Sequence, residues 1–279
     1  MTAHSMGHSF STILFDLDGT LYEEERIYDR YAEELTRLMP ESRRRAFLAD
    51  WTAVKSGQSE FRVGRGYDVE RGHLFTHSSG RITGYLDQEG ASPAAESLAE
   101  GEPGDIRFGT ARMNIGDFWG ILAALAAHHG LQHPERQTAF AATRAHMSSN
   151  QGKLAADEGL RELLRSLRKG GKRLIAMSNS PADTVRDTFA QLGIQDCFSQ
   201  IMADSDKPAG LIAFLASAAN VGQILSMGDN FVNDIEPALN AGAQALYIDR
   251  HRTALGSDRE GCYLVPSISA AREWLLTCR

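Results

Sequence analysis

The sequence predicts an α/β protein with a central parallel sheet and a mostly helical inserted domain. Three observations support this prediction. Short apolar runs without alternation, such as residues 12–15, are typical of strands buried on both faces. From residue 157 onward, such runs alternate with amphipathic helical segments. Between residue 23 and about residue 150 the alternation stops and helical spacing dominates, which indicates an insertion after the first strand.

Composition narrows the possible classes of protein. The chain has 279 residues, of which 42% are hydrophobic and 23% are charged, and no apolar run approaches the length of a membrane span. Its formal charge of −7 argues against a nucleic-acid polymer as partner. Residues 1–9 lack the basic and apolar regions of a signal peptide, so we expect a disordered leader and a cytoplasmic location. The odd number of cysteines, 3, argues against a disulfide framework.

The first strand, residues 12–15, runs directly into Asp16, Asp18 and Gly19. Ligands of open parallel sheets bind outside the carboxyl ends of the strands, so this position suggests a site. In an extended segment the side chains of Asp16 and Asp18 would point to the same side, and two crowded carboxylates call for a cation or a proton between them. Gly19 permits a sharp turn that the hydroxyl of Thr20 can hold.

The inserted segment predicts helices at 24–39, 43–54, 115–129 and 134–147. Between them, residues 73–77 and 82–86 are β-prone and flank a turn, so we predict a β-hairpin. Residues 92–104 are typical of an exposed loop or short helix, and 148–152 of a hinge. The segment contains His73, His77, His128, His129 and His133, but without carboxylate or cysteine partners at fixed spacing they do not favour a metal site.

After residue 157 each predicted strand is followed by polar residues. The predicted strands are 172–177, 197–203, 223–227 and 243–248, and the predicted helices are 157–169, 182–192, 209–220, 235–240 and 269–277. Ser178 and Asn179 follow the first of these strands, Lys207 follows the second, and Asp229 and Asp234 follow the third. Ser178 or Ser180 could instead only cap the next helix.

Four of these segments resemble, in order, the four signatures of the haloacid dehalogenase-like (HAD) hydrolases: DLDGT at 16–20, SNSP at 178–181, DKP at 206–208 and GDNFVND at 228–234. The resemblance implies a Rossmann-like core at 10–22 and 151–279, with a cap domain at 23–150. The chain resembles the phosphatase type of this family, because a dehalogenase is not expected to carry an aspartate at the position of Asp18. Residues 67–74 also resemble a hairpin of cytosolic nucleotidase-type members.

The resemblance implies a Mg²⁺-dependent phosphomonoester hydrolase that acts on a small phosphorylated metabolite through an aspartyl-phosphate. Asp16 would be the nucleophile, Asp18 the acid and base, and Lys207 the cation that neutralises charge. The implied phosphate-binding residues are Thr20, Ser178, Asn179 and Lys207. The implied metal ligands are Asp16, the Asp18 carbonyl, Asp229 and Asp234, with Asp234 either in the outer shell or bound directly.

Two alternatives remain open at this point. A phosphomutase would use the same aspartates but exclude water from the site. A non-catalytic module that binds a phosphorylated ligand would need no acid or base, so the presence of both Asp16 and Asp18 counts against it. The sequence identifies neither the substrate nor the oligomeric state.

Overall fold

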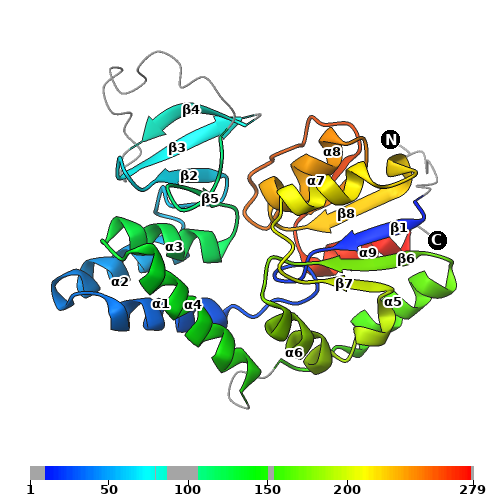
Figure 1. Ribbon diagram of the computed structural model, residues 1–279, viewed down its shortest axis with the longest axis horizontal. Coiled ribbons are helices and arrows are strands. Elements are labelled where there is room, and N and C mark those ends of the chain that lie inside the picture. Colours follow the sequence, from blue (N-terminus) through cyan, green and yellow to red (C-terminus); the bar gives the residue numbers. More distant parts are fainter. Residues whose placement is uncertain (1–9, 79, 87–105, 150–153, 278–279) are drawn as a thin grey trace. The chain divides into compact units, whose positions relative to one another are not determined.

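The computed structural model describes residues 10–78, 80–86, 106–149 and 154–277 (Figure 1). The chain divides into two compact units: a core unit formed by Met1–Glu24 and Ser148–Arg279, and an inserted unit, Glu25–Met147. The predicted leader at 1–9, the predicted loop at 92–104 and residues 150–152 of the predicted hinge lie outside the described residues. No helix in the described ranges is long and apolar enough to cross a membrane.

A six-stranded sheet with the order β10-β9-β8-β1-β6-β7 runs through the core unit, and its neighbouring strands are parallel. The α/β fold predicted from the sequence is therefore confirmed. The strands are β1 (Thr12–Phe15), β6 (Arg173–Met177), β7 (Gln200–Met202), β8 (Ile224–Gly228), β9 (Gln244–Ile248) and β10 (Cys262–Val265).

Strand β1 lies inside the sheet, and both of its faces are covered. Leu14 belongs to a buried cluster with Leu211 and Leu215, which come from the helix after β7. On the other face, the ring of Phe15 lies edge-on against Phe198 at 5.7 Å between centroids. This two-sided burial explains why the strand is a continuous apolar run rather than an alternating one.

Helices and short helical turns connect the strands. They are α5 (Glu158–Lys169), α6 (Ala182–Leu192), η2 (Gln195–Cys197), α7 (Ala209–Ala216), η3 (Val221–Gln223), the π-helical turn η4 (Phe231–Ile235), α8 (Glu236–Asn240) and α9 (Ile268–Leu276). Strand β10 was not predicted, because its four residues follow a Gly-rich and charged loop.

The order of the strands marks where a ligand would bind. From β1 the chain continues to β6 and β7 on one side, then crosses to β8, β9 and β10 on the other. The direction therefore reverses between β1 and β8, and this switch point is the usual ligand-binding crevice of an open parallel sheet. Phe15 pairs in register with Ala176 and Met227, so the residues after β1, β6 and β8 leave the sheet at one level.

The inserted unit combines helices with an antiparallel sheet of order β4-β3-β2-β5. The elements are α1 (Arg26–Leu38), α2 (Glu41–Lys55), β2 (Arg65–Asp68), β3 (His73–Ser78), β4 (Arg81–Leu86), β5 (Arg112–Ile115), α3 (Phe118–His128) and α4 (His133–Ser148). The predicted hairpin is confirmed by the pairing of β3 with β4. The sequence did not reveal that β2 and β5 extend it.

One predicted helix in this unit began too early. Residues 115–129 were predicted as a helix, but Ile115 ends β5 and α3 begins at Phe118. The Asp117 side chain accepts a hydrogen bond from the N–H of Gly120 over 2.7 Å, so it caps the helix at that point. The apolar face of α3 is core as expected, since Leu122 and Leu125 are fully buried.

Candidate active site

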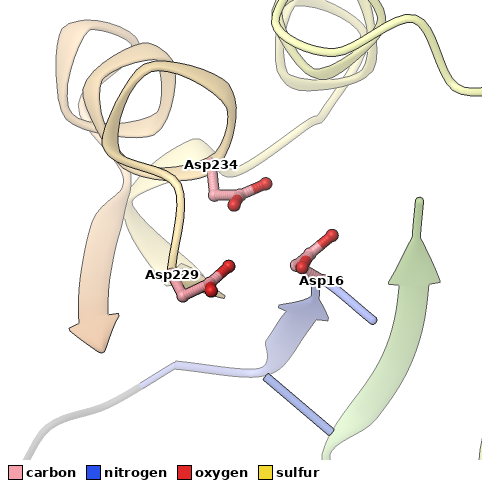
Figure 2. A group of neighbouring side chains, drawn as sticks. All are labelled: Asp16, Asp229 and Asp234. Atoms are coloured by element: carbon pink, nitrogen blue, oxygen red, sulfur yellow. The ribbon is translucent and has the colours of Figure 1, made fainter. Parts of the chain in front are cut away.

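Three carboxylates converge at the switch point of the parallel sheet. Asp16 follows β1, Asp229 follows β8, and Asp234 lies in the π-helical turn that comes next. Their nearest carboxylate oxygens all lie within 4.8 Å of one another. Figure 2 shows the three carboxyl groups turned toward the same region, although they come from three separate positions in the chain.

The loop after β8 holds Asp234 close to the strand end. The Asp234 carboxylate accepts a hydrogen bond from the Asn230 N–H over 3.2 Å, and the Asn230 side chain accepts one from Asn233. Gly228 is required here, because a Cβ at that position would lie 2.3 Å from Asp234 Oδ2. Asn230, rather than Asn233, therefore supplies the side-chain cap of the turn.

Lys207 bridges two of the carboxylates. Its Nζ lies 2.6 Å from Asp16 Oδ1 and 2.6 Å from Asp234 Oδ1, and its side chain is almost fully buried. Burial raises the pKa of Asp16, and raises that of Asp234 to about 7, although Lys207 partly offsets both shifts. Burial alone would lower the pKa of Lys207, but the two carboxylates raise it above its ordinary value, so the ammonium remains charged.

The loop that carries Lys207 is fastened to the residues after β6. The Lys207 N–H donates to Asn179 Oδ1 over 2.6 Å, and Asn179 Nδ2 donates to the Lys207 carbonyl over 3.0 Å. Asp204 and Asp206 have φ angles of 46° and 50°, a left-handed conformation that aspartate adopts more readily than most residues. The Asn179 side chain, predicted as a phosphate contact, thus lies on the backbone of Lys207.

Neither Ser178 nor Ser180 caps α6. Pro181 occupies the N-cap, and the N–H of Ala182 donates to Asp204 Oδ2 over 3.1 Å. The Ser178 oxygen accepts from the N–H of Ser180, which leaves its hydroxyl proton able to donate to a ligand. Both serines are buried beside the strand end.

Asp18 is held by hydroxyl groups. Ser180 Oγ donates to Asp18 Oδ2 over 3.0 Å, and the Tyr22 hydroxyl donates to Asp18 Oδ1. Thr20, four residues after Asp16, places its Oγ1 3.5 Å from Asp16 Oδ2. The predicted site residues therefore gather at the ends of β1, β6, β7 and β8, and Ser180 and Tyr22 join them as direct partners of Asp18.

Sequence reasoning assigned no role to Arg250, which follows β9 and contacts this site. Its guanidinium lies 3.1 Å from Asp229 Oδ2 and also donates to the Gly19 carbonyl and to the Glu23 carboxylate. One signal was available: residues 249–252 follow a predicted strand, as the other site residues do. The order of the strands, which places β9 beside β8, was needed to interpret it.

The donor set is suited to a hard divalent cation. It consists of carboxylate oxygens, the ligands that Mg²⁺ prefers, and it contains neither cysteine nor histidine. Lys207 contacts Asp16 through Oδ1 and Arg250 contacts Asp229 through Oδ2. Each of these two carboxylates therefore contacts the cationic side chain beside it through one oxygen. Three carboxylates against two cationic side chains leave the cluster net negative, which favours a cation.

Comparisons with known proteins identify the family of this chain. The model of a family described as haloacid dehalogenase-like hydrolase matches residues 10–242. No significant match was found among curated proteins. The putative HAD-hydrolase YfnB from Bacillus subtilis, bound to magnesium, is 13% identical, with a TM-score of 0.52 over 96% of this chain and 99% of that one. A predicted phosphoglycolate phosphatase from Haemophilus somnus is 18% identical, with a TM-score of 0.50 over 95% and 97%.

An L-2-haloacid dehalogenase from Xanthobacter autotrophicus is also similar, at 13% identity and a TM-score of 0.46 over 96% of this chain and 98% of that one. At identities this low, the structural similarities establish the fold alone.

Proposed function

This chain belongs to the haloacid dehalogenase-like hydrolase family, and from that premise we propose that it is a Mg²⁺-dependent phosphomonoester hydrolase. Its substrate would be a small phosphorylated metabolite, and the reaction would pass through an aspartyl-phosphate. The observation that carries the proposal is the cluster of Asp16, Asp229 and Asp234, bridged by Lys207 and accompanied by Asp18. The magnesium bound to the similar YfnB structure also supports it.

Asp16 is the proposed nucleophile. One of its oxygens attacks phosphorus in line with the ester oxygen, a P–O bond to Asp16 forms, and the P–O bond to the leaving alcohol breaks. Lys207 contacts Asp16 Oδ1 and would also offset charge on the transferred phosphoryl group. The ammonium is held by two carboxylates, so it is already oriented before the substrate arrives.

Asp18 is the proposed acid and base. As the P–O bond breaks, its carboxyl gives a proton to the leaving alcohol. In the second half of the reaction it takes a proton from the water that attacks phosphorus, and the Asp16 carboxylate is released with inorganic phosphate. The hydroxyls of Ser180 and Tyr22 each donate to one oxygen of Asp18 and so orient its carboxyl group for proton transfer.

The remaining residues would bind the cation and the phosphate. Asp16, the Asp18 carbonyl, Asp229 and Asp234 would hold Mg²⁺, which when bound neutralises charge on the phosphoryl oxygens. Thr20, Ser178 and Lys207 would contact phosphate with their side chains. Because the Asn179 side chain is hydrogen-bonded to the backbone of Lys207, Asn179 would bind phosphate through its backbone N–H.

Dehalogenation is the competing reaction within this family. A halide leaves without a proton, so that reaction has no use for an acid at the position of Asp18. This difference favours phosphate esters. A phosphomutase would share the aspartates and would differ in transferring the phosphoryl group without release of inorganic phosphate.

A substrate panel tests the proposal. Phosphorylated metabolites, including nucleoside monophosphates, sugar phosphates and phosphoglycolate, are incubated with the protein and Mg²⁺ while inorganic phosphate is measured, and halide release is measured from 2-haloacids. We expect phosphate release that disappears in Asp16→Asn and persists in Asp206→Asn, an exposed aspartate next to Lys207. Halide release, or an Asp16→Asn variant as active as the parent, would refute it. A stable phosphoryl transfer to a sugar phosphate would identify a mutase.

A further inference from the structure

Arg250 joins three parts of the core unit through one guanidinium group. Nη2 donates to the Gly19 carbonyl and to Asp229 Oδ2, and Nη1 donates to Glu23. An Nη group carries two protons, so both protons of Nη2 are used, one on the turn after β1 and one on the aspartate after β8. The Arg250 side chain is 15% exposed and that of Asp229 is 13% exposed.

The backbone around Gly19 is shaped to permit these contacts. Gly19 has a φ of 75°, and a Cβ there would lie 2.1 Å from Asp229 Oδ2 and 2.4 Å from Arg250 Nη2. The turn that follows Asp16 and Asp18 therefore packs directly against the carboxylate of Asp229. Arg250 lies across this contact and donates to a group on each side of it, the Gly19 carbonyl and the Asp229 carboxylate.

We propose that Arg250 is a positioning residue for the metal site. It fixes the orientation of the Asp229 carboxylate relative to the Asp16–Asp18 turn, so that the groups on β1 and β8 can bind one Mg²⁺ together. The inference rests on the proposed metal-dependent function. It does not follow from the four sequence motifs, since Arg250 lies outside them.

A positioning role and a charge role predict opposite changes in metal binding. If Arg250 acted only as a positive charge near Asp229, its removal would make the cluster more negative and Mg²⁺ would bind more tightly. If it orients Asp229, its removal would weaken binding, since loss of a partner that orders a metal ligand typically costs about tenfold or more in metal affinity. A role confined to stability would lower the melting temperature without changing the Mg²⁺ affinity.

The experiment is a calorimetric Mg²⁺ titration of the full chain without substrate, together with thermal unfolding in EDTA. We expect Arg250→Met to bind Mg²⁺ about tenfold more weakly than the parent. Arg250→Lys keeps the charge, but one ammonium cannot reproduce the planar fork, so it should also bind more weakly. Arg252→Met is the matched control, because it removes the same charge from an exposed position in the same loop. It should bind Mg²⁺ as the parent does.

Unchanged or tighter Mg²⁺ binding by Arg250→Met would overturn the inference. So would parental binding by Arg250→Lys, which also answers the question if Arg250→Met fails to fold. If the parent protein hydrolyses phosphomonoesters with Mg²⁺ but the Arg250 variants do not bind Mg²⁺ more weakly, the proposed function stands and the proposed positioning role of Arg250 is wrong. If the parent binds no Mg²⁺, both are wrong.

Discussion

Asn179 and Lys207 are joined by two hydrogen bonds between a side-chain amide and a backbone. The Lys207 N–H reaches Asn179 Oδ1 over 2.6 Å, and Asn179 Nδ2 reaches the Lys207 carbonyl over 3.0 Å. A primary amide donates and accepts in one plane, as these two bonds require. The position of the buried ammonium between Asp16 and Asp234 therefore depends on a residue after a different strand.

Replacement of Asn179 is expected to lower turnover more than substrate binding. Asn179→Ala removes both bonds and frees the Lys207 backbone, and a displacement of about 1 Å at a catalytic group can cost roughly 100-fold in rate. We expect kcat to fall by roughly 10- to 100-fold with a smaller change in KM. Steady-state kinetics on the best substrate of the panel would measure this effect.

The control for Asn179 comes from the same loop. Ser205 Oγ donates to the Met202 carbonyl, so Ser205→Ala removes a loop hydrogen bond without touching Lys207. Its kcat should stay near that of the parent. Equal kinetics for Asn179→Ala and the parent would contradict the proposed link.

Replacement of Asp18 should affect the two half-reactions differently. Asp18→Asn cannot protonate a leaving group, but p-nitrophenolate leaves without help, so the first step should survive with p-nitrophenyl phosphate. Hydrolysis of the aspartyl-phosphate still needs a base and should slow by roughly 100- to 10,000-fold. Rapid-mixing experiments should therefore show a burst of about one p-nitrophenolate per enzyme. A steady-state rate without a burst, equal to that of the parent, would show that Asp18 is not the base.

Mg²⁺ binding should strengthen as the pH rises. Burial raises the pKa of Asp16 above its ordinary value, and raises that of Asp234 to about 7. The Asp234 carboxyl is therefore partly protonated near neutral pH, and the cation must displace its proton. Lys207 does not contribute to this pH dependence, because its raised pKa keeps the ammonium charged. Calorimetry between pH 6 and 8 in two buffers of different ionisation enthalpy should reveal proton release, and pH-independent binding would contradict the prediction.

Gly66 in the inserted unit should not tolerate a side chain. A Cβ there would lie 2.1 Å from Phe75 Cζ, and Phe75 is fully buried, with its ring stacked on Phe108. Gly66→Ala should destabilise the protein by roughly 1–3 kcal/mol through overpacking. Gly109→Ala is the matched control, because its Cβ would meet no atom within 4 Å. Equal melting temperatures for the two variants would refute the prediction.

The parts of the fold that the sequence predicted were those encoded by local pattern. The strands before Asp16, Ser178 and Asp229 were found because a buried parallel strand is a continuous apolar run followed by polar residues. Their proximity followed from a general rule, since the ends of parallel strands share one edge of the sheet.

Other features depend on contacts that no local pattern encodes. Strand β2 contains Gly66 and Asp68, which are poor strand formers, and it forms only because β3 and β5 pair with it. Arg250 resembles any charged residue in a loop until β9 is placed next to β8. Asn179 was correctly located at the strand end, but its sequence context could not show that its amide would bind the backbone of Lys207.

The insertion after β1 also affects the order in which the chain can fold. The partners of β1 are β6 and β8, and the nearer of them begins 158 residues after Phe15, at Arg173. At typical rates of synthesis, β1 would leave the ribosome on the order of ten seconds before β6 is made. During that interval Ile13, Leu14 and Phe15 have no sheet to join, whereas the strands β2 to β5 of the inserted unit are all made before β6. A strand that is covered on both faces in the finished sheet is therefore the one that must stay soluble longest while the chain is incomplete.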